Sequence, residues 1–114
     1  MHLMNLAERS LGNEVFGRIA ARAALHAYEA PTDIADLCCG AAGRAYAMLD
    51  MFRHTGERQW LTRAHALAER AVGLADRGFL ARSSLYKGEV GVALLLADLD
   101  RPELSCMPLF DREP

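Results

Sequence analysis

The chain has 114 residues, a formal net charge of −2, and 52% hydrophobic and 25% charged residues. This length allows one small domain or a piece of a larger one. Lys and Arg form no block, which argues against a nucleic-acid partner, and no apolar run approaches the roughly 20 residues that a membrane span needs. The first residues lack the pattern of an export signal, so we expect a cytoplasmic protein, in which paired cysteines indicate metal binding or catalysis rather than a disulfide scaffold.

Alanine and leucine dominate the composition, which favours helices, and no stretch alternates as a strand would. The predicted fold class is all-α. Four helices are expected, over residues 6–28, 41–55, 57–76 and 89–100. Pro31 follows the first, Gly56 is the expected stop of the second, and a loop over 77–88 precedes the last. Regular structure is expected to end at Pro102.

An internal repeat relates the segment "LCCGAAGRAYAMLDM" to the segment "LYKGEVGVALLLADL", 48 residues further on. Each unit, over about 6–54 and 57–100, consists of a long amphipathic helix, a loop ending in L-x-x-G-x-x-G, and a shorter apolar helix; residues 101–114 form a tail. The first glycine is expected to allow positive φ, and the second to let helices approach closely. The alternating polarity predicts two layers of helices, with the apolar ones inside. Five pairs are identical: Leu37 with Leu85, Gly40 with Gly88, Gly43 with Gly91, Ala45 with Ala93, and Asp50 with Asp98.

Cys38 and Cys39 stand at the predicted junction of the loop and the second helix. There both side chains can face one pocket, and thiolates gain from the positive end of the helix dipole. This suits zinc, which wants four ligands, although the pair supplies only two. Three alternatives remain open: core packing of two small apolar side chains, oxidation of the pair in a redox switch, and a noncatalytic helical-repeat fragment that serves interaction.

The segment "LCCGAAGRAYAML" resembles the zinc-binding segment of the lanthionine synthetase C-like (LanC-like) family, usually L-C-H-G-x-A-G. The segment "SLYKGEVGVALLLADL" resembles the last G-x-x-G repeat of the same family. The resemblance implies an α/α toroid, a double-layer helical barrel of about seven helix-pair repeats, of which this chain holds about two. It further implies a Zn²⁺-dependent cyclase that adds a peptide cysteine thiol to dehydroalanine or dehydrobutyrine. Cys38 matches the family's metal-binding cysteine, whereas Cys39 stands where most members have a histidine ligand.

Other parts of the family's site have no counterpart in this sequence. The remaining zinc cysteine would lie about one repeat before Cys38, upstream of Met1, and no residue matches the family's acid–base histidine. The resemblance therefore implies a C-terminal fragment that carries no catalytic residue and is inactive alone. Its expected partners are a peptide substrate and the remainder of the toroid, or a second copy that covers the apolar helix faces.

Tyr86 and Lys87 occupy the positions of Cys38 and Cys39 in the second repeat unit. They are weak candidates for lining the same mouth and contacting an acidic or phosphorylated peptide. Arg44 is expected to form a salt bridge at the rim. Four histidines and the third cysteine are expected to have no catalytic role: His2, His26, His54, His65 and Cys106.

Overall fold

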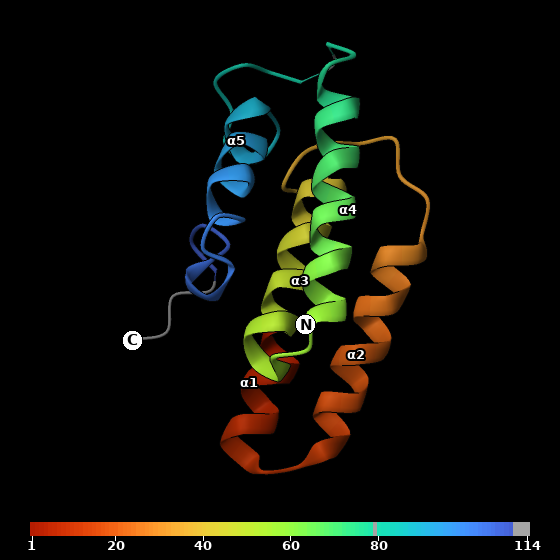
Figure 1. Ribbon diagram of the computed structural model, residues 1–114, viewed down its shortest axis with the longest axis vertical. Coiled ribbons are helices and arrows are strands. Elements are labelled where there is room, and N and C mark those ends of the chain that lie inside the picture. The colour runs from red at the N-terminus through yellow and green to blue at the C-terminus, as the bar shows by residue number, and fades with distance from the viewer. Residues whose placement is uncertain (79, 111–114) are drawn as a thin grey trace.

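The computed structural model describes residues 1–78 and 80–110. Within them the chain is helical throughout and has no strand, only an isolated bridge between Ala81 and Gly88, which confirms the all-α prediction. None of the described helices is both long and apolar enough to cross a membrane. The helices (Figure 1) are α1 (His2–Leu11), α2 (Glu14–Glu29), α3 (Ala41–Thr55), α4 (Arg58–Ala75), α5 (Glu89–Asp98) and the 3-10 helix η1 (Pro102–Leu104).

The predicted single helix over 6–28 is wrong, because the chain breaks there into α1 and α2. Gly12 adopts the left-handed conformation, with φ at 62°, and its N–H donates to the carbonyl of Glu8 at 2.8 Å, which closes α1. The Asn13 side chain then accepts a hydrogen bond from the Val15 N–H at 3.0 Å, which opens α2. A glycine followed by an N-capping asparagine is a helix-stop and helix-start signal that outweighs a continuous apolar stripe.

The three later helices start and end within two residues of the predicted bounds. Gly56 ends α3 as predicted, with φ at 72°. The tail differs, because Pro102 begins the short helix η1, a position where its fixed φ is favourable. Of the predicted loop and tail, Phe79 and residues 111–114 lie outside the described residues.

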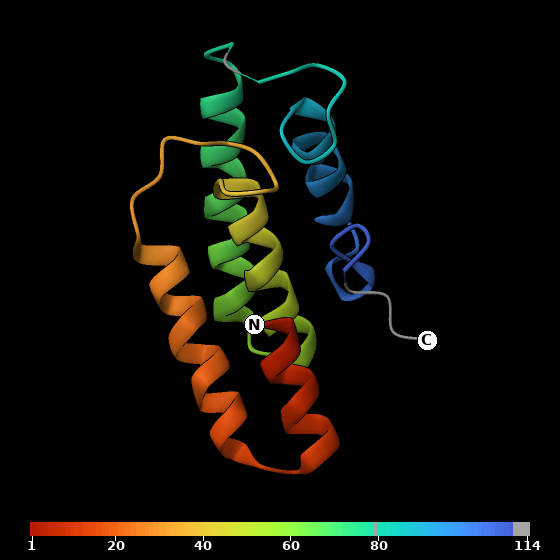
Figure 2. The same cartoon turned by 180° about the vertical axis from the view of Figure 1, so that it is seen from behind.

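The helices form two layers. α3 contacts α1 and α5, and α2 and α4 each pack against their chain neighbours. In Figure 1 α4 passes in front of α3, and in Figure 2, from behind, α3 passes in front of α4. The core lies between these two helices, where Met48, Leu49, Trp60 and Leu67 are buried. This order is that of a partial α/α toroid, as predicted, with α3 and α5 in one layer and α2 and α4 in the other.

The two repeat units begin their inner helices in the same way. Gly40 precedes α3 and Gly88 precedes α5, and both have extended backbone, with φ at −103° and −139°. The expectation of positive φ is therefore wrong. The glycines are needed for space instead, because a Cβ at Gly40 would clash with the carbonyl of Ile34 and one at Gly88 with the carbonyl of Ala81.

The second glycine of each motif also meets its own loop. A Cβ at Gly43 would clash with the carbonyl of Leu37, and one at Gly91 with the carbonyl of Leu85. The expected close approach of helices is not what fills these positions, and the neighbour from the other unit at Gly91 is the side chain of Leu37, a loop residue. The loop therefore folds back over the first turn of its helix in both units, which fixes the position of the residues just before the helix.

The repeated aspartates link successive helices of the inner layer. Asp50 of α3 accepts hydrogen bonds from His2 at 3.0 Å and Asn5 at 2.6 Å, both on α1. Asp98 of α5 accepts one from the Tyr46 hydroxyl of α3 at 2.7 Å. The same motif position thus ties each inner helix to the one before it, and His2 takes part in this tie.

Candidate functional site

Cys38 and Cys39 lie at the mouth of the fold, in the loop that leads from α2 to α3, and both side chains are exposed. Their sulfur atoms are 3.3 Å apart. The Cys38 N–H donates to the carbonyl of Tyr86 at 3.0 Å, and the Cys39 N–H donates to the Asp36 carboxylate at 2.9 Å. Each cysteine is therefore held through its backbone, and both sulfurs are exposed side by side, where they can face one ligand. Exposure of this kind does not fit the alternative of core packing.

The second repeat unit contributes a cation to the pair. The Lys87 ammonium lies 3.5 Å from the Cys39 sulfur and 3.7 Å from an oxygen of Asp36, whose side chain is buried. Hydrogen bonds to Cys38 and Cys39, followed by the charge of Asp36, raise the pKa of Lys87 above its ordinary value. Lys87 is thus a cation at neutral pH, in contact with solvent on one side and with sulfur on the other.

The sulfurs border a hollow of about 220 Å³ beside the start of α3. Residues from four parts of the chain line it, among them Met1, Ala27, Arg44 and Met107. A second hollow of about 430 Å³ lies on the other side of Lys87, between the cysteine loop and the end of α4. Its lining combines apolar side chains with two acids and two bases: Ile34, Leu74, Leu80, Asp33, Asp36, Arg77 and Lys87.

The structure brings Tyr86 and Lys87 to the cysteine pair, as the repeat alignment predicts. Their two side chains differ in what they do. The Tyr86 hydroxyl donates to the carbonyl of Pro108, and its ring meets the edge of Phe110 with 6.2 Å between centroids. Tyr86 therefore anchors the tail, while Lys87 is the one of the two whose charged end reaches the sulfurs.

The family model described as "Lanthionine synthetase C-like protein" matches residues 3–111. The chain belongs to this family. It is also similar to the curated "Glutathione S-transferase LANCL1" of Danio rerio, with 33% identity over 78 residues that cover 66% of this chain and 19% of that protein. The LanC-like chain thus spans about a fifth of the length of that relative. No solved structure matches it.

Other predicted residues of the LanC-like chain have structural roles. Arg44 forms no rim salt bridge in the described part of the structure. It donates instead to the carbonyls of Ala27 at 3.2 Å and Ala30 at 2.5 Å, which closes the end of α2. Cys106 is partly buried in the tail, where its N–H donates to Asp98.

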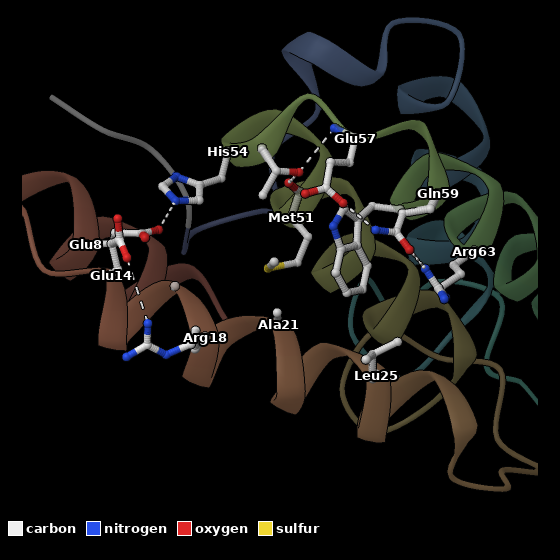
Figure 3. A pocket seen from close by; sticks show the side chains of 13 residues that line it. Glu8, Glu14, Arg18, Ala21, Leu25, Met51, His54, Glu57, Gln59 and Arg63 are labelled. Carbon is white, nitrogen blue, oxygen red and sulfur yellow. Dashed lines mark hydrogen bonds and ion pairs between the residues drawn. The ribbon is translucent and has the colours of Figure 1, made fainter.

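A larger hollow of about 690 Å³ lies at the opposite end of α3, between α2 and the start of α4 (Figure 3). Its charged side chains pair with one another. His54 contacts Glu8 at 2.5 Å, and Arg18 contacts Glu14 at 3.8 Å. Arg63 lies over the ring of Trp60, 5.1 Å from its centroid. The His54–Glu8 contact ties α3 to α1, whereas the other two contacts lie within α2 and within α4.

One contributor to the cysteine site, Asp36, was missed in the sequence. Asp36 stands three residues before Cys39, a spacing at which an aspartate often accepts a backbone N–H and closes a turn. Lys87 is the single lysine of the chain, beside 12 arginines. The single lysine among so many arginines is a feature of the composition that could have directed attention to Lys87. Among residues 1–78 and 80–110, no group of three or more His, Cys, Asp or Glu side chains is placed to hold a metal ion.

Proposed function

We propose that this LanC-like chain supplies two zinc ligands, Cys38 and Cys39, to an enzyme that activates thiols for addition to a carbon–carbon double bond. The observation that carries the proposal is the exposed pair of sulfurs, 3.3 Å apart, in the motif position of the family's metal ligands. The substrate is a peptide cysteine, and the acceptor is dehydroalanine or dehydrobutyrine in the peptide. Bound zinc would hold the incoming sulfur as a thiolate at neutral pH.

The pair suits such an ion as half of its ligand set. Two thiolates bound at about 2.3 Å from a tetrahedral zinc are about 3.8 Å apart. The sulfurs of Cys38 and Cys39 are 3.3 Å apart, so a small side-chain rotation would bring them to that separation. The backbone contacts of Cys38 and Cys39 leave that rotation free. The remaining protein ligand and the group that moves the proton would come from polypeptide outside this chain. The isolated chain is therefore expected to bind metal weakly and to be inactive.

The proposed reaction is the addition of a thiol S–H across the carbon–carbon double bond of the dehydroamino acid. A carbon–sulfur bond forms at the β-carbon of the dehydroamino acid, and the double bond becomes single. The proton of the thiol ends on the α-carbon, so no oxidant or reductant is needed. What this chain contributes is the position of the sulfur ligands, set by the loop that the glycines Gly40 and Gly43 allow to fold back on α3.

A second candidate shares the same thiol activation. The relative from Danio rerio is named a glutathione S-transferase, which favours a small thiol added to an electrophile in place of a peptide cysteine. The two candidates separate in the full-length protein. Cyclase activity consumes a dehydrated peptide without change in mass, whereas transfer adds the mass of the small thiol to the acceptor.

The metal ligands can be tested on the chain itself. We expect cobalt(II), a spectroscopic substitute for zinc, to produce thiolate charge-transfer absorption with the wild-type chain. The double variant Cys38→Ala/Cys39→Ala should lose this absorption. Cys106→Ala is the matched control, because it removes a thiol of the same chain that lies outside the pair, and it should retain the signal.

Three other results would count against the proposal. Absorption that survives in the double variant would place the metal elsewhere. No uptake by a wild-type chain of unchanged helicity would favour a noncatalytic helical-repeat fragment. Loss of two hydrogens from the Cys38–Cys39 peptide under mild peroxide, together with no metal uptake, would favour the redox switch.

A further inference from the structure

The one lysine of the chain sits where it can act on the cysteine pair. Lys87 follows Cys39 by 48 residues and holds the matching position in the next repeat unit. Its ammonium is 3.5 Å from the Cys39 sulfur and 3.7 Å from Asp36. Asp36 in turn accepts the Cys39 N–H at 2.9 Å, so the three side chains form one cluster across two repeat units.

The charge of this cluster differs from what the usual motif would give. Most members of the family resemble L-C-H-G, in which the second ligand is a neutral imidazole. This chain has a thiol at Cys39, which adds one negative charge to the site when it is ionised. An anionic site that must also accept an incoming thiolate gains from a cation nearby, since opposite charges at this distance attract even in water. Lys87 places one positive charge beside the Cys39 sulfur, and the ammonium is shared with the Asp36 carboxylate 3.7 Å away.

We propose that Lys87 is a positioning residue that offsets the additional thiolate of Cys39 and holds its sulfur at the mouth of the site. The proposal rests on the proposed function only in treating Cys39 as a ligand. Asp36 completes the arrangement, because its buried carboxylate keeps the ammonium near Cys39 while the long side chain of Lys87 remains exposed. A cysteine in place of histidine at this motif position and a lysine one repeat later then form one functional unit.

The contact can be tested without metal, from the rate at which iodoacetamide alkylates Cys39 at neutral pH. Peptide mass spectrometry separates Cys39 from Cys106, and tandem fragmentation separates it from Cys38. Lys87→Met should slow the reaction at Cys39 about two- to fivefold, the range expected when an exposed cation next to a thiolate is lost. Lys87→Arg should restore the wild-type rate. Arg77→Met is the matched control, since Arg77 is a cation that lines the 430 Å³ hollow together with Lys87.

A second arm tests the role toward metal. Cobalt(II) is titrated with an excess of 2-mercaptoethanol, which fills the coordination positions that the chain leaves open and gives the site its full negative charge. Lys87→Met should weaken binding about two- to fivefold relative to wild type and to Lys87→Arg.

The outcomes separate the two proposals. If the wild type binds cobalt and Lys87→Met binds it equally well, the role of Lys87 is overturned while the proposed function stands. If the wild type binds no cobalt, the proposed function fails, and the alkylation rates still decide whether Lys87 acts on Cys39. Equal slowing by Arg77→Met and Lys87→Met would also overturn the proposal, because it would show a general effect of net charge.

Discussion

Individual glycines decide how the cysteine loop sits on α3. Gly43 has no room for a side chain, because a Cβ would clash with the backbone carbonyl of Leu37. Gly73 in α4 is the opposite case, since nothing lies within 4 Å of the position of its Cβ. Gly43 therefore has a steric reason to be glycine, at the cysteine site. Nothing in the packing of the described residues requires a glycine at Gly73.

Alanine substitutions at these glycines should have opposite effects. Gly43→Ala forces the loop away from the helix and should destabilise the chain by about 1–3 kcal/mol, the usual cost of overpacking. Gly73→Ala, the matched control, should stabilise it by about 0.5–1 kcal/mol, because alanine is the better helix former. Urea unfolding followed by circular dichroism measures both. Equal effects of the two substitutions would show that the contact with Leu37 does not constrain the loop.

The sequence predicted some of the cysteine site and missed the rest, for a physical reason. Cys38, Cys39, Tyr86 and Lys87 could be placed together because the repeat relates them by position. The hydrogen bond from the Cys39 N–H to the Asp36 carboxylate depends on how the loop turns, and the periodicity of the sequence does not encode that turn. The positive φ expected for the glycines was wrong for the same reason, since close approach of a carbonyl is a tertiary contact.

At the scale of helices, α3, α4 and α5 were predictable from the sequence, and the break between α1 and α2 was not. α3 and α4 carry regular apolar spacing, and their bounds follow from it. α1 was merged with α2 because apolar residues continue on both sides of the break at Gly12. The junction between α2 and α3 shows a further feature that spacing does not reveal, since Arg44 of α3 reaches back to the last carbonyls of α2.

Removing the Arg44 side chain should loosen α2 from the inner layer. Arg44→Met keeps the apolar stem but leaves the carbonyls of Ala27 and Ala30 without this donor, and we expect a loss of about 1.5–3 kcal/mol, as for a hydrogen bond to a charged group. Hydrogen exchange should show the largest increase at the last turn of α2. Arg22→Met, at an exposed position of the same helix, is the control. Uniform faster exchange throughout the chain would contradict a local role for Arg44.

On the scale of the whole molecule, the described chain has two open apolar edges. Exposed apolar side chains occur on α5 and η1 (Val90, Leu96 and Leu104) and on α1 and α2 (Leu3, Val15 and Ile19). In Figure 1 α5 and α2 lie on opposite sides of α3. The accessible surface is 6830 Å². A compact monomer of this mass would have about 6,200 Å². Two different apolar faces suit head-to-tail packing, which gives a ring where the rotation between copies closes and an open filament where it does not.

An isolated chain should therefore associate through these edges. Leu96 is 44% exposed on α5, and Leu96→Glu places a charge in that face. We expect analytical ultracentrifugation to show concentration-dependent association of the wild type and a shift of the variant toward the 12.5 kDa monomer. Thr62→Glu adds the same charge at an exposed position of α4 and should leave association unchanged. A wild-type chain that stays monomeric at high concentration would contradict this prediction, because it would show that these apolar faces do not drive association.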